Sequence, residues 1–171
     1  MHKKSELLTK GAWEDGVLWE FYFGENLTNL PLVSVCGLYI KNERILLTRN
    51  SRGWDITGGH IEKDETPIET LYREMLEEGG VKVSDHRHIG YYVLTYTQNT
   101  INKSTGLPYP DNAIIPCFLV NTKKPIQALT AKECSDAKMF YIYGPEVQNL
   151  REKGLFNGIY KYAKEKNLLF S

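Results

Sequence analysis

The feature that most constrains the fold is a helix with clearly marked ends near the middle of the chain. Residues 66–69, Thr-Pro-Ile-Glu, form a capping box with proline at the first helical position, which is a strong signal for a helix N-terminus. The pair Gly79-Gly80 gives the stop, because glycine readily adopts the left-handed conformation that ends helices. The sequence therefore predicts a helix from about Pro67 to Glu78.

This helix has two distinct faces. At 100° per residue, an apolar stripe and a neighbouring arc of carboxylates fall on adjacent sides of it. The stripe expected to face the core is Ile68, Leu71, Tyr72 and Met75, and the acidic arc is Glu74, Glu77 and Glu78. Three like charges in the last turns repel one another, and the helix dipole disfavours each of them by about 0.3–1 kcal/mol.

An acidic cluster of this kind suits a hard divalent cation with oxygen ligands, because the cation offsets the repulsion. An isolated Glu-Glu pair is more often a solvated helix face, so the surrounding residues decide between the two interpretations. Those residues resemble the signature of the Nudix hydrolase family, Gly-x5-Glu-x7-Arg-Glu-U-x-Glu-Glu-x-Gly-U, where U is a bulky aliphatic residue. The positions in register are Gly59, Glu65, Arg73, Glu74, Met75, Glu77, Glu78, Gly80 and Val81.

The resemblance implies an α/β/α sandwich around a mixed β-sheet, with the signature, or Nudix box, as loop, helix and loop. It implies that Glu77 and Glu78 ligate Mg²⁺, with Mn²⁺ able to substitute, and that Glu74 is a ligand or the general base. The backbone carbonyl of Gly58 is expected to join as a ligand.

Other residues of the box have supporting roles in the family. Arg73 and Glu65 are expected to orient the loop and the helix, and Gly59 and Gly80 to shape the loops. The family often has proline before its two glycines, whereas this chain has Thr57.

Alternating and β-branched segments on both sides of the box predict strands. They are residues 19–23, 32–40, 44–48, 90–97, 113–120 and 139–142, followed by an amphipathic helix at 155–166. Residues 98–112 are polar and proline-containing, which predicts a long surface loop. We expect residues 1–31 to form an N-terminal extension, as an edge strand or a dimer contact, and residues 32–167 to form the Nudix domain.

Three residues between the second of these strands and the glycine loop are candidates for substrate binding: Arg49, Arg52 and Trp54. Each has an ordinary alternative, since loop arginines are often only solvated and a tryptophan beside a tight loop often packs on the core.

Other residues outside the box are weaker candidates. Residues 86–88, His-Arg-His, resemble a metal site, but a polar loop is the preferred interpretation. Glu133 lies where some relatives place an extra carboxylate. Cys36, Cys117 and Cys134 are expected to be buried, reduced thiols.

Composition limits the partners. Lys plus Arg (21) balances Asp plus Glu (21) over 171 residues, which argues against a nucleic acid polymer or an acidic membrane as partner. Neither an export signal nor a membrane-spanning segment is visible in the sequence, so a cytoplasmic protein is expected.

The resemblance implies Mg-dependent hydrolysis of a diphosphate bond in a nucleoside diphosphate linked to another group. The alternative is a catalytically silent nucleotide-binding module with the same fold, and the three glutamates favour the enzyme. Substrate candidates are nucleoside triphosphates, ADP-ribose, nucleotide sugars, dinucleoside polyphosphates and dinucleotide cofactors. A homodimer through the aromatic N-terminal segment is compatible with the sequence.

Overall fold

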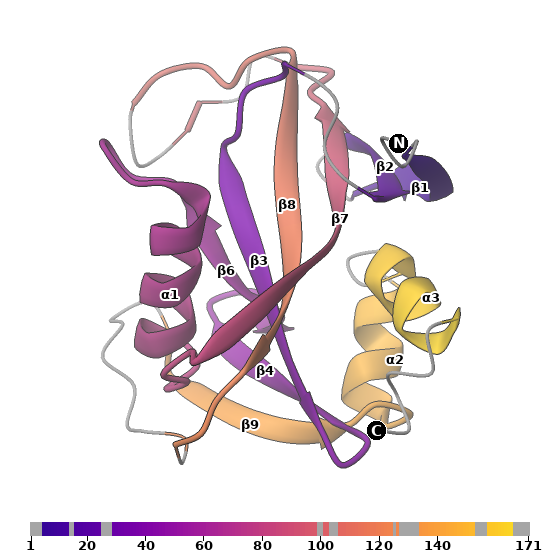
Figure 1. Ribbon diagram of the computed structural model, residues 1–171. Coiled ribbons are helices and arrows are strands. Elements are labelled where there is room, and N and C mark those ends of the chain that lie inside the picture. Colours follow the sequence, from indigo (N-terminus) through magenta and orange to yellow (C-terminus); the bar gives the residue numbers. More distant parts are fainter. Residues whose placement is uncertain are drawn as a thin grey trace.

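In the computed structural model, a mixed β-sheet forms the centre of the protein and helices lie on both of its faces (Figure 1). The structure describes residues 5–13, 16–24, 29–98, 101–102, 106–124, 126, 134–152 and 157–165. Its strands are β1 (Glu6–Ala12), β2 (Leu18–Phe23), β3 (Ser34–Lys41), β4 (Arg44–Asn50), β5 (Gly53–Asp55), β6 (Thr57–His60), β7 (Asp85–Thr95), β8 (Asn112–Asn121) and β9 (Asp136–Tyr141). Its helices are α1 (Pro67–Glu77), α2 (Pro145–Glu152) and α3 (Asn157–Glu165).

The strand order is β1-β2-β7-β8-β3-β4-β5, with β6 on β3 and β9 on β4. The pairing of β3 with β8 is parallel and the other strand pairs are antiparallel. Helix α1 covers one face of the sheet, and α2 and α3 cover the other (Figure 1). The expected α/β/α sandwich around a mixed sheet is therefore confirmed.

Two apolar clusters hold these layers together. Leu71 and Met75 of α1 are fully buried against one face of the sheet, together with Val35 and Val120. A larger cluster on the opposite face includes Ile159 of α3. Burial of a large aliphatic side chain stabilises the fold by about 1.5–3 kcal/mol, so these contacts fix α1 firmly on the sheet.

The central helix forms as its sequence predicts. Thr66 accepts a hydrogen bond from the backbone N–H of Glu69, and the Glu69 carboxylate accepts one from the N–H of Thr66, which completes the capping box. Glu78 is the C-cap, and Gly80 has a positive φ of 64°.

Two expectations about side chains near this helix are wrong. Tyr72 is 38% exposed, because the buried face of α1 is centred on Leu71 and Met75 and leaves Tyr72 at its edge. The hydroxyl of Tyr72 lies 3.1 Å from Nδ1 of His86. His86 and His88 belong to β7 and not to a loop, and both rings pack edge-on against Phe118. Pairing with β8 and β-strand alternation override the polar character of this segment.

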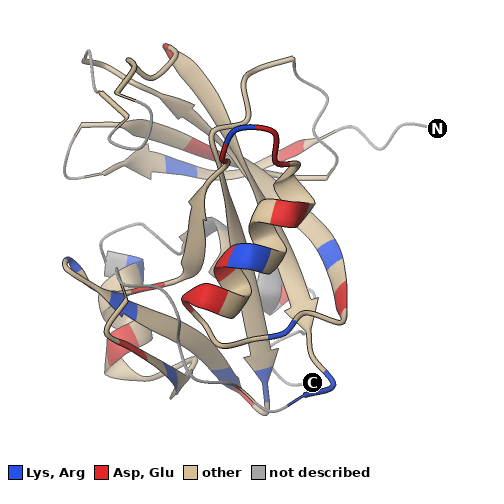
Figure 2. Cartoon of the chain, turned by 90° about the vertical axis from the view of Figure 1, so that its left-hand side faces the viewer, with Lys and Arg blue, Asp and Glu red and all other residues tan. Residues whose placement is uncertain are grey.

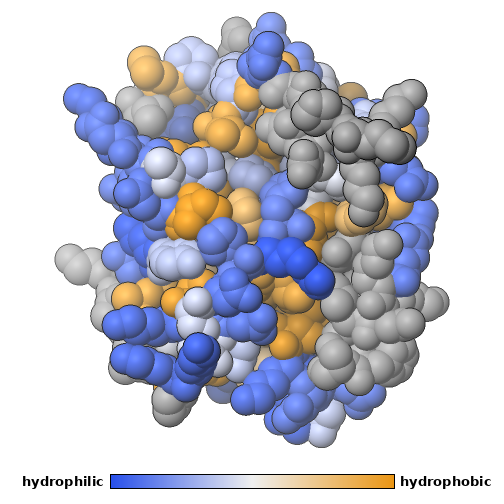
Figure 3. All heavy atoms as spheres, in the orientation of Figure 1, coloured by the Kyte–Doolittle hydropathy of each residue, from blue (hydrophilic) through white to orange (hydrophobic). Residues whose placement is uncertain are grey.

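The aromatic N-terminal segment forms β2, as its alternation predicts, and pairs with β7. Its side chains Trp19 and Phe21 point into the large core cluster, and β1 completes a hairpin at the edge of the sheet. On the face shown in Figure 3, hydrophobic residues reach the surface in separate groups among hydrophilic ones. The homodimer stays a prediction.

Helix α2 and the short strands β5 and β6 were not expected from the sequence, whereas β1 forms an edge strand within residues 1–31. Strand β7 begins five residues earlier than predicted. Helix α3 confirms the C-terminal amphipathic helix, although both of its predicted ends lie outside the described residues. Cys36, Cys117 and Cys134 are free and buried, as expected. Among the described residues, no helix is long and apolar enough to cross a bilayer.

Candidate active site

The guanidinium of Arg73 ties the loop before α1 to the helix itself. Its Nε and Nη2 donate to the two carboxylate oxygens of Glu65 at 2.7 and 2.9 Å, the paired geometry that arginine offers a carboxylate. Nη2 also donates to the carbonyl of His60 at 3.1 Å. These bonds hold the pKa of Glu65 down at about 2, mainly through the hydrogen bonds from Arg73 and despite the opposing effect of burial. The supporting role expected for this pair fits the geometry.

Glu74 is the most buried carboxylate of the acidic arc, with 11% of its side chain exposed. Its Oε1 accepts a hydrogen bond of 2.7 Å from Nη1 of Arg73. Burial, followed by the negative charge of Glu78, raises the pKa of Glu74 to about 7, and Arg73 opposes this shift. A cation beside Glu74 would act in the same direction as Arg73 and favour the ionised form.

Glu78 faces the glycine loop. The backbone N–H of Gly58 lies 3.4 Å from its Oε2, and the thiol of Cys134 donates to its Oε1 at 3.2 Å. Burial and the contact with Glu78 raise the pKa of Cys134 to about 12, so the thiol stays protonated and can donate. Gly58 and Glu78, both expected at the metal, are thus brought together by β6 and the end of α1.

Glu77 completes the arc at the more open side, with 44% of its side chain exposed and Nη1 of Arg73 at 3.7 Å. Figure 2 shows acidic and basic residues together on the outward face of α1. All side-chain donors of the arc are carboxylate oxygens, the ligand type that Mg²⁺ and Mn²⁺ prefer. The donor set therefore fits a hard divalent cation.

The carboxylates do not converge on one point in this arrangement. Within the described residues, no group of three or more His, Cys, Asp or Glu side chains is gathered closely enough to hold a metal ion. In this arrangement Glu74 accepts a hydrogen bond from Arg73, and Glu78 accepts one from Cys134. Metal ligation by these residues is a prediction that the fold permits.

Close packing explains why glycine occupies two positions of β6, the strand that takes the place of the expected glycine loop. A Cβ on Gly59 would overlap the carboxylate of Glu74, and one on Gly58 would overlap the carbonyl of Val35. Beside them, Thr57 is buried, and its hydroxyl has no hydrogen-bond partner in the described part of the chain. The side chain that departs from the family pattern is thus buried at the start of β6.

The candidate substrate residues separate into two groups. Arg49 pairs with Trp54 across β4 and β5, and its guanidinium lies 5.9 Å from the centre of the indole ring. Lys138 of β9 lies 5.7 Å from the same ring. Arg52 projects from the turn, with its side chain 82% exposed and Asp55 at 3.7 Å. Arg49 and Trp54 lie on the same face of the β4–β5 pair, where Trp54 is partly buried and packs against the large core cluster. Substrate binding by Arg49, Arg52 and Trp54 stays a prediction.

The long loop between β7 and β8 reaches the Nudix-like box through Tyr109. Its hydroxyl lies 2.5 Å from Nε2 of His60, and its ring stacks on Tyr96 at 4.6 Å. Since the carbonyl of His60 accepts from Arg73, the loop is connected to the helix through this contact. Glu133, which the sequence offered as an extra carboxylate, lies outside the described residues.

Comparison with known proteins decides the family. Residues 30–146 match the family model described as NUDIX domain, which covers more than half of the chain. The chain belongs to the Nudix family. Over 73 residues it is 36% identical to a MutT-like protein of Streptomyces ambofaciens, a match that spans 40% of this chain and 47% of that protein. The chain thus spans about half the length of the curated relative it matches.

Solved structures show the same Nudix fold. A pyrophosphohydrolase of Bacillus subtilis superposes with a TM-score of 0.68 at 17% identity, over 92% of this chain and 98% of that one. The Nudix domain of Shewanella oneidensis NrtR, in complex with ADP ribose, gives 0.53 at 14% identity over 81% and 90%. At these identities the likeness shows the fold alone.

The structure also adds three residues to this Nudix site that sequence patterns did not indicate. Cys134 contacts Glu78 and Tyr109 contacts His60, both from loops, whereas Lys138 of β9 contacts the ring of Trp54, one of the candidate substrate residues. A lone cysteine, a loop tyrosine and a strand lysine carry no local signal of their own, so only the pairing of β4 with β9 and the course of the loops reveal them.

Proposed function

We propose that this Nudix domain hydrolyses a diphosphate bond in a nucleoside diphosphate linked to another group, with Mg²⁺ as cofactor and Mn²⁺ as substitute. The observation that carries the proposal is the position of Glu78, which lies between the backbone of Gly58 and the thiol of Cys134, on the same helix end as Glu74 and Glu77. A divalent cation bound there would neutralise the charge on the diphosphate oxygens and activate a water molecule.

Each residue then has a distinct task. Glu77 and Glu78 hold the cation, with the Gly58 carbonyl as a further ligand. Glu74 is a ligand or the general base, and it lies beside Gly59 of the box with its carboxylate bonded to Arg73. Arg73 keeps the helix and the loop in register through Glu65. Water attacks phosphorus, the bridging oxygen leaves with the departing phosphate, and the proton of the water goes to the base.

The substrate is expected to lie against the surface formed by Arg49 and Trp54. Arginine can bind phosphate oxygens through paired hydrogen bonds, and an indole face can stack on a base. Lys138 adds a second cation on the same ring. This surface favours a nucleotide over a phosphate ester without a ring, and it does not rank the substrate candidates among one another.

The second candidate function is a nucleotide-binding module without turnover. The Nudix domain of the Shewanella protein, solved with ADP ribose, shows that this fold also occurs as a ligand-bound domain. The complete set of Glu74, Glu77 and Glu78 favours the enzyme. The boundary between residues 1–31 and 32–167, the homodimer and the cytoplasmic location stay predictions.

The deciding experiment is a phosphate-release screen with purified protein, Mg²⁺ and a coupling phosphatase or pyrophosphatase. The substrates are nucleoside triphosphates, ADP-ribose, nucleotide sugars, dinucleoside polyphosphates and dinucleotide cofactors. Glu78→Gln should abolish turnover, whereas Glu6→Gln, an exposed carboxylate on β1 at the far edge of the sheet, should leave it unchanged. If no substrate turned over while a nucleotide still raised the melting temperature, the binding module would be the better assignment.

A further inference from the structure

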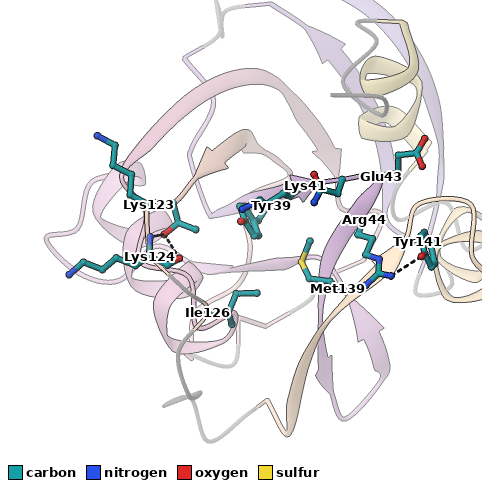
Figure 4. Close-up of a pocket in the computed structure, with 11 residues that line it drawn as sticks. Tyr39, Lys41, Glu43, Arg44, Lys123, Lys124, Ile126, Met139 and Tyr141 are labelled. Atoms are coloured by element: carbon teal, nitrogen blue, oxygen red, sulfur yellow. Dashed lines mark hydrogen bonds between the residues drawn. The ribbon is translucent and has the colours of Figure 1, made fainter.

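A concave surface lies where the β3–β4 turn, the end of β8 and β9 meet (Figure 4). This groove has a volume of about 800 Å³, within the range of small-molecule sites. Its lining residues of interest are Tyr39, Lys41, Arg44, Lys123, Lys124 and Tyr141. We call it the basic groove.

The basic groove concentrates positive charge in a chain that is neutral as a whole. Lys41, Arg44, Lys123 and Lys124 line it against a single carboxylate, Glu43, so the lining carries a formal charge of four minus one, or +3. In the part of the chain that the structure describes, none of the four cationic groups forms an ion pair with a carboxylate. Among the described residues, the charge of the groove is therefore not balanced by ion pairs.

The arrangement of Lys41 and Arg44 is unfavourable for folding. They stand directly opposite one another across the β3–β4 hairpin, and like charges in that position destabilise a sheet. Tyr141 holds Arg44 in place. The guanidinium of Arg44 lies 4.3 Å from the centre of the Tyr141 ring and donates a hydrogen bond of 2.7 Å to the Tyr141 hydroxyl. A bound anion would offset the repulsion between the two cations.

The opposite side of the groove is also ordered by local hydrogen bonds. The hydroxyl of Thr122 accepts a hydrogen bond of 3.1 Å from the backbone N–H of Lys124. It donates a hydrogen bond of 2.8 Å to the carbonyl of Lys82. These bonds fix the turn that presents Lys123 and Lys124. Figure 4 shows these two lysines on one side, Arg44 and Tyr141 on the other, and Tyr39 with Met139 between them.

We propose that the basic groove binds a small molecule that carries two or more phosphate groups, at a site separate from the Nudix box. The phosphates contact the lysines and Arg44, and the apolar floor of Tyr39 and Met139 accommodates a neutral ring such as a nucleobase. Cys36 of β3 pairs with Gly58, just before the box. Lys41 lies five residues further along β3, so it is about 17 Å from Cys36. The groove and the acidic arc therefore have opposite charge and different places on the sheet.

The test is calorimetric titration with inorganic triphosphate and, separately, with ATP, both in EDTA so that no divalent cation is available. Two double variants remove charge from opposite sides of the groove: Lys123→Gln with Lys124→Gln, and Lys41→Gln with Arg44→Gln. The matched control, Lys10→Gln with Arg87→Gln, removes the same charge from exposed positions on β1 and β7. Circular dichroism and melting temperature verify the fold of each variant.

We expect both probes to bind wild type and Glu78→Gln equally, and each groove variant to weaken binding at least about ten-fold while the control changes it little. Binding should also weaken as the salt concentration rises. Absence of binding to wild type, equal weakening in the control, or loss only in Glu78→Gln would each overturn the proposal. Because Glu78→Gln removes turnover and not groove binding, failure here is distinguishable from failure of the proposed hydrolysis.

Discussion

Replacement of Arg73 tests whether one guanidinium holds the box together. Arg73 donates two hydrogen bonds to Glu65, one to Glu74 and one to the carbonyl of His60, with 22% of its side chain exposed. A hydrogen bond to a charged group contributes about 1.5–3 kcal/mol when buried, and an exposed ion pair about 0–1 kcal/mol. At partial exposure we take about 1–1.5 kcal/mol for each carboxylate partner, and about 3 kcal/mol for the whole set.

Arg73→Ala should therefore lower the free energy of unfolding by about 3 kcal/mol, equivalent to a fall in Tm of about 6–12 °C for a chain of this size. Arg73→Lys should lose about half as much, because an ammonium group keeps the charge but cannot form the paired bonds with Glu65. Urea unfolding followed by tryptophan fluorescence measures both. Arg52→Ala is the control, since Arg52 is 82% exposed and should change stability by less than about 0.5 kcal/mol.

The reasoning would be refuted if Arg73→Ala were as stable as wild type to within about 0.5 kcal/mol, or if the control lost as much. It would also be refuted if the lysine variant were indistinguishable from wild type, because the geometry of the guanidinium would then not matter.

Three further predictions follow from the site. Glu65→Gln should be less stable than wild type, and the difference in the free energy of unfolding should be complete above about pH 4.5. It should shrink as the pH falls towards 2, because the pKa of Glu65 is lowered to about 2 in the folded protein. Equal differences in urea unfolding at about pH 7 and about pH 3 would contradict this. Gly59→Ala should displace the carboxylate of Glu74 and reduce kcat about 100-fold while the protein stays folded, as steady-state kinetics and circular dichroism would show. Cys134→Ala should reduce kcat about five-fold through loss of the donor to Glu78, and Cys134→Ser should restore it; a serine variant no better than alanine would argue against a hydrogen-bonding role.

The sequence by itself determined the central helix and the box. Both depend on interactions between residues close in the chain: the capping box closes within four residues, and Gly80 adopts its left-handed conformation without help from distant contacts. For the same reason the order of the acidic arc on α1 could be read from helical spacing. The strands with clear alternation, such as β8, were also recognisable.

Only the tertiary structure decided which distant residues meet. Cys134 contacts Glu78 across 56 positions of sequence, and this contact depends on the pairing of β4 with β9. Tyr72 was misplaced because helical periodicity gives the width of the apolar face and not its centre, which the sheet beneath α1 sets. The basic groove likewise gathers Lys41 at the end of β3 and Lys123 in the turn after β8, because the parallel pairing of the two strands brings together the ends of segments far apart in the chain. Local patterns fix elements, whereas sheet register and long-range packing fix their neighbours.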